Sequence, residues 1–179
     1  MINSKRHLIA VSLIILSGIT FLGFQKKGGG NNFDTKPMDI GVVVSDLEKS
    51  LDFYTNVIGM TKVSTYHFSG ENAKTAGLTD GRALDIINLK LNDEPGAPGY
   101  KLTKIQDVKS SPLSNSFNPG FRYISIFVKD LEPYLNRINE RNIKLLNKIN
   151  PMVAPEGYKA IVLQDPDGAI VELIWLPKN

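Results

Sequence analysis

Two segments of the chain share one pattern, and this internal repeat constrains the fold more than any other feature of the sequence. Residues 39–51 (DIGVVVSDLEKSL) and 123–135 (YISIFVKDLEPYL) each begin with an apolar, β-rich stretch and continue with apolar residues at helical spacing. The Asp between the two parts, Asp46 or Asp130, suits a helix N-cap because its carboxylate can accept free N–H groups of the first turn. We therefore predict a strand and then a helix in each half of the chain.

Three further strand-like stretches follow each predicted helix. They span 60–68, 83–91 and 100–106 in the first half, and 143–149, 158–164 and 170–175 in the second. Residues 165–168 (DPDG) are a strong turn signal, because Pro presets φ and Gly allows a positive φ, so the last two strands should form a hairpin. Each half reads β-α-β-β-β. We expect an α+β fold in which the two modules pair into one curved, cupped mixed sheet with the helices outside.

The sequence predicts five segments. Residues 1–30 form an export signal or N-terminal membrane anchor, and 31–36 form a linker. The first βαβββ module spans 37–106, an inter-module linker rich in Ser, Pro and Asn spans 107–120, and the second module spans 121–177.

The N-terminus has the pattern of a targeting segment. Lys5-Arg6 precedes an apolar run without charged residues at 8–24, which a Gly-rich tract follows. A basic lead-in before an apolar run is typical of secretory signals, and the length of this run is at the short end of what spans a bilayer. We expect the body to be extracytoplasmic, either secreted or anchored to a membrane by 8–24, with cleavage left open.

Composition excludes several classes of site. The chain has no Cys, and its two histidines are His7, in the targeting segment, and His67. Thiolate zinc sites, cysteine nucleophiles and His-rich metal cages within one chain are therefore excluded. The net charge of +3 arises in residues 1–30, which hold four bases and no acid; the remainder has 17 bases against 18 acids. This balance disfavours nucleic-acid binding.

Two segments, the first of which overlaps 39–51, resemble a known family. Residues 40–60 (IGVVVSDLEKSLDFYTNVIGM) and 162–177 (VLQDPDGAIVELIWLP) are similar to the opening and closing signatures of the vicinal oxygen chelate superfamily. This superfamily includes glyoxalase I, bleomycin-resistance proteins and extradiol dioxygenases, and the resemblance covers about 38–177. It implies paired βαβββ modules around a cupped cavity, where the family's enzymes hold a divalent metal that chelates two substrate oxygens.

The resemblance also implies four metal-ligand positions. The first, usually His, is Asp39 here; the second, usually an acid or His, falls on Lys101 or Thr103. The third, normally His, is Tyr123, and the fourth is a Glu that is retained as Glu172. Oxygen ligands from Asp39 and Glu172 would suit magnesium, manganese or calcium rather than zinc. A lysine at the second position would instead put its positive charge where the metal ion would lie. We therefore expect no cofactor, and a divalent metal is the alternative.

The role of Glu172 has two interpretations. A carboxylate in the apolar stretch Ala-Ile-Val-Glu-Leu-Ile-Trp needs a metal, a cation or hydrogen bonds to offset its desolvation. Glu172 is therefore either a metal ligand or general base, or a structural residue paired with Lys101. Two other candidates for ligand binding are His67, which could reach the cavity mouth or lie on the surface, and Trp175, which could line a pocket or belong to the core.

Three functions stay open at this stage. The first is an exported domain that binds a small molecule in its cavity, as the bleomycin-resistance type does, with the usual metal site mostly lost. The second is a metal-dependent lyase or isomerase with an Asp39/Glu172 oxygen site, and the third is a non-catalytic interaction domain tethered to a membrane. An extradiol dioxygenase is not expected, because the body has one histidine. The expected partners are a small molecule, a membrane through the N-terminal segment, and a second copy in a homodimer.

Overall fold

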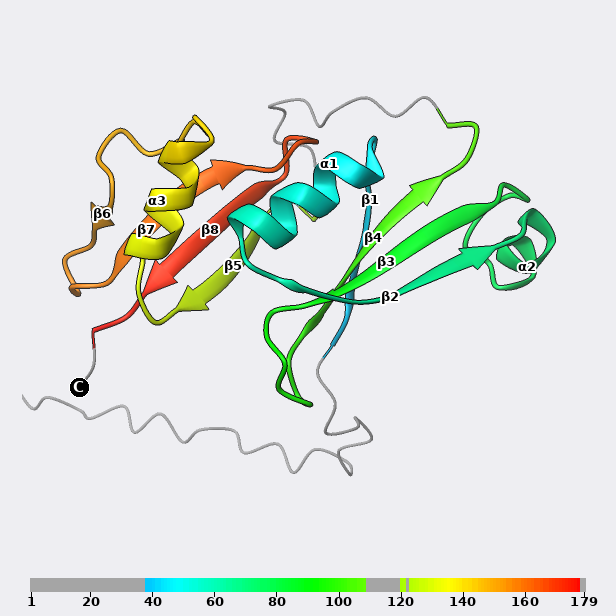
Figure 1. Ribbon diagram of the computed structural model, residues 1–179, viewed down its shortest axis with the longest axis horizontal. Helices are drawn as coiled ribbons and strands as arrows, with labels where there is room; N and C mark the ends of the chain where they lie inside the picture. Colours follow the sequence, from blue (N-terminus) through cyan, green and yellow to red (C-terminus); the bar gives the residue numbers. More distant parts are fainter. Residues whose placement is uncertain (1–37, 109–119, 122, 178–179) are drawn as a thin grey trace, which may run out of the picture. The chain divides into compact units, whose positions relative to one another are not determined.

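Eight strands form two mixed sheets in the part of the chain that the computed structural model describes, residues 38–108, 120–121 and 123–177 (Figure 1). The first sheet has the order β1-β4-β3-β2, with strands β1 (Ile40–Val43), β2 (Thr61–Phe68), β3 (Leu84–Lys90) and β4 (Gly99–Ile105). The second has the order β5-β8-β7-β6, with β5 (Tyr123–Val128), β6 (Met152–Val153), β7 (Lys159–Gln164) and β8 (Ile170–Trp175). The pairs β1–β4 and β5–β8 are parallel, and the other neighbouring strands are antiparallel.

This arrangement confirms the α+β class and the two βαβββ modules. The strands form two four-stranded sheets rather than one continuous hydrogen-bonded ladder, with β1 and β5 as edge strands. Both sheets belong to one compact unit, Asp34–Asn179, which contains every member of the described hydrophobic core. A unit of this size with its own core can fold as a domain.

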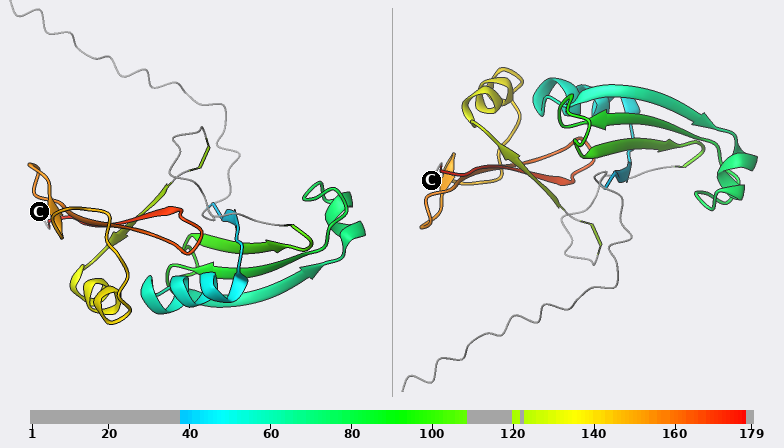
Figure 2. Two further views of the ribbon diagram at one scale, coloured as in Figure 1. Left: turned by 90° about the horizontal axis from the view of Figure 1, so that it is seen from above. Right: turned by 90° about the horizontal axis from the view of Figure 1, so that it is seen from below.

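The helices begin largely where capping residues predict. Helix α1 (Leu47–Asp52) is capped by Asp46, whose carboxylate accepts a hydrogen bond from Lys49 N at 3.1 Å, and it continues as the π-helical turn η1 (Phe53–Val57). Helix α3 (Glu132–Glu140) has Leu131 at its N-cap, although the Asp130 carboxylate still accepts from Glu132 N. The short helix α2 (Gly70–Thr75) was not predicted. Figure 2 shows α1 and α3 on the same side of the sheets.

None of the helices in the described residues is long and apolar enough to cross a membrane. The apolar run 8–24, predicted as a signal or anchor, lies outside the described residues.

The predicted strand at 143–149 is wrong. Only an isolated bridge joins Leu145 to Leu163 in this stretch, and the edge strand is the shorter β6. The side chain of Asn147 explains the difference, because it binds the backbone of β7, donating to Ala160 O at 3.0 Å and accepting from Val162 N at 2.7 Å. The amide side chain thus makes two hydrogen bonds to β7 that the backbone of a regular strand would have made.

One hydrophobic core joins the two modules on the side of the sheets that α1 and α3 cover. Its fully buried members alternate along the strands; Val171 and Leu173, for example, have no exposed surface, whereas Glu172 between them points to the opposite face. The core takes Val44, Phe53, Tyr54, Val57, Ile58, Met60, Ile87, Leu89, Tyr100 and Leu102 from the first module, and Ile126, Leu131, Ile138, Ile161, Leu163, Val171 and Leu173 from the second.

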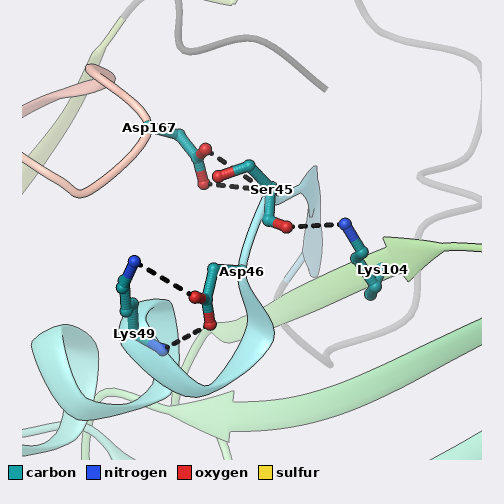
Figure 3. Close-up of polar contacts among 5 residues, drawn as sticks. All are labelled: Ser45, Asp46, Lys49, Lys104 and Asp167. Carbon is teal, nitrogen blue, oxygen red and sulfur yellow. Dashed lines mark hydrogen bonds and ion pairs between the residues drawn. The ribbon is translucent and has the colours of Figure 1, made fainter. Parts of the chain in front are cut away.

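The 165–168 hairpin between β7 and β8 binds the first module through two carboxylates. The two carboxylate oxygens of Asp167, Oδ1 and Oδ2, accept hydrogen bonds of 3.1 and 3.0 Å from Ser45 N, just before α1 (Figure 3). Lys104 holds the same residue from the other side by donating to Ser45 O at 2.6 Å. The hairpin therefore fixes the start of α1 against the second module.

The second carboxylate, Asp165, is buried. Its Oδ2 accepts from the Tyr54 hydroxyl at 2.9 Å, and that hydroxyl lies 3.0 Å from the Tyr100 hydroxyl. Its Oδ1 accepts from the backbone of Asp167 and Ala169 inside the hairpin. Burial raises the pKa of Asp165 and of Tyr54, and it raises the pKa of Tyr100 to about 12. The two phenols therefore remain protonated, and Tyr54 remains a donor to Asp165.

Replacement of Tyr54 by Phe is expected to lower the free energy of unfolding by about 1–3 kcal/mol, because it leaves an oxygen of a buried carboxylate without its donor. Urea unfolding of the body measures this loss. Tyr66→Phe is the matched control, since Tyr66 is exposed and its loss of a hydroxyl should cost less than about 0.5 kcal/mol. Equal stability of the two variants would show that the bond to Asp165 does not hold the modules together.

Candidate functional site

The face of the two sheets that points away from α1 and α3 carries the polar residues of the candidate site. On β4, the exposed-face residue Lys101 lies between Tyr100 and Leu102, which are both buried in the core. On β8, Glu172 lies in the same way between buried residues. The strand alternation thus brings Lys101 and Glu172 to the open face of their respective sheets.

The strand register decides which β4 residue corresponds to Glu172. Gly41 on β1 pairs with Lys101, and Ser125, at the corresponding position of β5 in the second module, pairs with Glu172. Thr103 pairs instead with Val43, two residues further along the strand. Of the two residues that the sequence left open for the second ligand position, Lys101 is therefore the one that corresponds to Glu172 in strand register.

An ion pair occupies the two positions of the first module. The Lys101 ammonium lies 3.0 Å from Asp39 Oδ2, and the two side chains are 40% and 45% exposed. The neighbouring Gly99 leaves room for this carboxylate, because a Cβ at that position would collide with it. The predicted pairing of Lys101 with Glu172 is not what the structure shows; Lys101 pairs with Asp39 within its own module.

Glu172 has a different partner. Ser125 Oγ donates a hydrogen bond of 2.6 Å to Glu172 Oε2 from the adjacent strand β5. The Glu172 side chain is partly exposed, so its charge is hydrated and does not require the metal or buried cation that its apolar sequence neighbours suggested. Those neighbours, Val171 and Leu173, face the core. The serine partner was missed, although a polar residue in the apolar strand YISIFV was a signal for it.

A cavity of about 220 Å³ lies between the edge strands β1 and β5. The side chains of the two polar pairs do not line it, although Gly41 in its wall is the register partner of Lys101. Its walls are mainly apolar and include Ile40, Gly41, Val43, Tyr123, Ile124 and Ile170. Tyr123, the residue at the third ligand position, is exposed at the start of β5. The cavity therefore has room for a small molecule next to a tyrosine.

Two predicted site residues lie elsewhere. His67 on β2 pairs with Asp85 on β3, and Nδ1 lies 2.7 Å from Asp85 Oδ1. The next β3 residue, Ile86, pairs with Thr103, which shares a face with Lys101 because the two are two residues apart on β4. Asp85 and its partner His67 therefore lie on the opposite face from the site. The hydrogen bond from His67 lowers the pKa of Asp85. Trp175 is three residues beyond Glu172 and packs against the core. The Lys159 Nζ lies 5.3 Å from the centroid of its ring.

Residues 38–173 match the family model of the Glyoxalase/Bleomycin resistance protein/Dioxygenase superfamily. The chain belongs to this superfamily. A probable lactoylglutathione lyase of Synechocystis sp. is 26% identical over 131 residues, which make up 73% of this chain and 88% of that protein. The lactoylglutathione lyase of Neisseria meningitidis serogroup A is 28% identical over 131 residues, 73% of this chain and 83% of the relative.

The solved structures agree on the fold. A glyoxalase family protein from Bacillus cereus superposes with a TM-score of 0.67 at 15% identity, covering 82% of this chain and 97% of its own. At this identity the likeness shows the fold and not the activity.

The residues of the superfamily site do not fit a divalent metal. A lysine ammonium has three N–H donors and no lone pair to give to a cation. Lys101 also neutralises Asp39, and Glu172 is engaged by Ser125. Within the ranges that the structure describes, no group of three or more His, Asp or Glu side chains could hold a metal ion.

This disagreement predicts how metal affinity depends on residue 101. Wild type and Lys101→Met should show no change in melting temperature with Mn²⁺, because neither supplies a second acid beside Asp39. Lys101→Glu adds that acid and should gain about 1.4 kcal/mol, or about 3–6 °C, at a Mn²⁺ concentration tenfold above its Kd. Thermal unfolding with and without Mn²⁺ measures the effect, and stabilisation of wild type would contradict the assignment.

Proposed function

We propose that the body binds a small molecule bearing an anionic oxygen, such as a carboxylate, on the open face of the sheets and without a divalent metal. The observation that supports this most directly is the ion pair of Lys101 and Asp39 in the place of two metal ligands. The ammonium uses one donor on Asp39 and has others for a second acceptor.

The chemistry of the face suits an amphipathic ligand. The apolar walls of the cavity between β1 and β5 would hold the body of the ligand, and the Tyr123 hydroxyl would serve as a polar contact. The Ser125–Glu172 pair would accept a hydrogen bond from a ligand hydroxyl or amine. The volume of about 220 Å³ lies below the roughly 300–1,000 Å³ typical of sites for drug-sized molecules. A single-ring or short-chain acid is therefore the expected size.

Asp39 has a positioning role in this proposal. It holds the flexible lysine side chain in one place, which reduces the conformational entropy that ligand binding would cost. Because the pair is about half exposed, it lends little stability to the fold. A ligand oxygen would displace water from the ammonium and strengthen the charge-assisted hydrogen bond.

A second candidate function is a lyase or isomerase reaction on the same face. The relatives named lactoylglutathione lyase favour it, as does Glu172, which occupies the position of the family's retained glutamate. In such a reaction the Lys101 ammonium would stabilise negative charge on a substrate oxygen. Glu172 would accept a proton from the adjacent carbon and return it to the neighbouring carbon, which restores the carboxylate. The ammonium would supply the positive charge that stabilises the substrate oxygen, so the reaction would need no metal.

Location and assembly complete the proposal. We infer from the sequence at 1–30 that the chain is exported and tethered to a membrane by residues 8–24. A homodimer is supported by the apolar residue Phe127, which is exposed on the edge strand β5 and which a second copy could cover. A non-catalytic interaction domain is the remaining possibility if no small molecule binds.

The proposal predicts a preference for carboxylates over their primary amides. In a two-dimensional NMR titration with matched acid and amide pairs, acids should shift the amide signals of Gly41, Lys101 and Tyr123. Lys101→Met should weaken this binding about 10- to 100-fold, since a hydrogen bond to a charged group contributes about 1.5–3 kcal/mol. Lys49→Met removes an exposed lysine on α1 and is the matched control.

Equal binding of acids and amides, or unchanged affinity in Lys101→Met, would contradict the proposal. Binding to Lys101→Met that matches the Lys49→Met control would point to the apolar cavity alone.

An assay of S-lactoylglutathione formation separates binding from catalysis. If the body is a lyase, Glu172→Gln should lower kcat about 10²- to 10⁴-fold while carboxylate binding persists, because it removes the general base and keeps the shape of the side chain. Asp165→Asn, in the hairpin away from the open face, tests whether a loss reflects folding. Absence of turnover by wild type would leave the binding function.

A further inference from the structure

The outer edge of the second module exposes apolar side chains that the core does not use. We name residues 144–153, which lead into and include β6, the β6 edge. Ile149 is 75% exposed and Val153 60% exposed, and Leu146 and Met152 are also exposed. Figures 1 and 2 place β6 and its flanking loops at the end of the second module that faces away from the first.

The β6 edge is held in place by the neighbouring strand. Leu145 packs against the core and bridges Leu163, which turns Leu146 outward. Asn147 binds the backbone of β7 through two hydrogen bonds. The exposed side chains therefore extend from a segment that the fold anchors.

The charge of the β6 edge is positive. It contains Lys144 and Lys148, both exposed, and no acidic residue. The adjoining β6–β7 hairpin adds one exposed cation, Lys159, which is the register partner of Val153, and one exposed acid, Glu156. Within the described residues neither Lys144 nor Lys148 has a salt bridge. This local charge contrasts with the remainder of the chain after residue 30, which has one more acid than base.

We propose that the β6 edge docks on the surface of an anionic lipid bilayer. Exposed aliphatic side chains flanked by lysines are complementary to the boundary between acyl chains and negatively charged headgroups. Pairing with a strand of another protein suits this edge less well. The strand β6 is only two residues long, and Pro151 and Pro155 beside it have no N–H to donate. This contact depends neither on the 8–24 segment nor on the function of the open face.

Vesicle flotation of the body, residues 34–179, tests the proposal without the apolar run 8–24. The probes are vesicles of phosphatidylcholine alone and vesicles of two parts phosphatidylcholine to one part phosphatidylserine. We expect wild type to float with the anionic vesicles and at least tenfold less with neutral ones. The double variants Ile149→Ser/Val153→Ser and Lys144→Glu/Lys148→Glu should each lose at least tenfold in binding, because each removes one of the two contributions.

Matched controls change the same chemistry in the first module. Val63→Ser/Leu78→Ser replaces two exposed apolar residues, and Lys62→Glu/Lys74→Glu reverses two exposed lysines; both should bind as wild type does. Circular dichroism and thermal unfolding establish that each variant is folded. The proposal is overturned if wild type does not float with anionic vesicles, or if edge and control variants bind alike. A change of oligomeric state in the edge variants would overturn it too, since a second copy would then be the occupant.

Discussion

The structure depends on the contact between the 165–168 hairpin and the first module. Neither sheet is hydrogen-bonded to the other in the described residues, so the modules are joined by the shared core and by side chains that cross between them. Asp165 and Asp167 supply two of these links, to the Tyr54 hydroxyl and to Ser45 N. On α3, Arg137 Nε donates to Val57 O at 2.8 Å. These polar bonds are directional, so they define how α1 and α3 lie beside each other in a way that an apolar core alone would not.

The orientation of the modules has a consequence for the open face. With both helices on one side, the faces carrying Lys101 and Glu172 are left to the solvent. The cavity between the modules is lined by residues of both edge strands, β1 and β5. The polar groups on this face are already paired within each module, Lys101 with Asp39 and Glu172 with Ser125. The superfamily fold is therefore kept, whereas the donor set that would hold a metal is replaced by a fixed ammonium. A fixed positive charge can still bind an anionic oxygen, and this links the retained architecture to the function proposed for it.

Sequence patterns predicted the features that depend on local structure. The shared pattern of 39–51 and 123–135 indicated two βαβββ modules, Asp46 marked the start of α1, and the 165–168 turn indicated the β7–β8 hairpin. The patterns failed where a side chain replaced the backbone: Asn147 prevents a regular strand over 143–149, and no periodicity of apolar residues reveals such a contact. Strand alternation would have separated Trp175 from Glu172, since residues three apart on a strand face opposite sides.

The sequence by itself determined the family, the modules and the residue types at four positions of the superfamily site. Those properties follow from composition, spacing and turn chemistry, which act over a few residues. Only the tertiary structure decided which partner each charge has. The choice of Lys101 over Thr103, the pairing of Lys101 with Asp39, and the placement of His67 on the opposite face all follow from strand register. Register brings together residues that are far apart in the chain, and a shift by one residue would exchange the two faces of a strand.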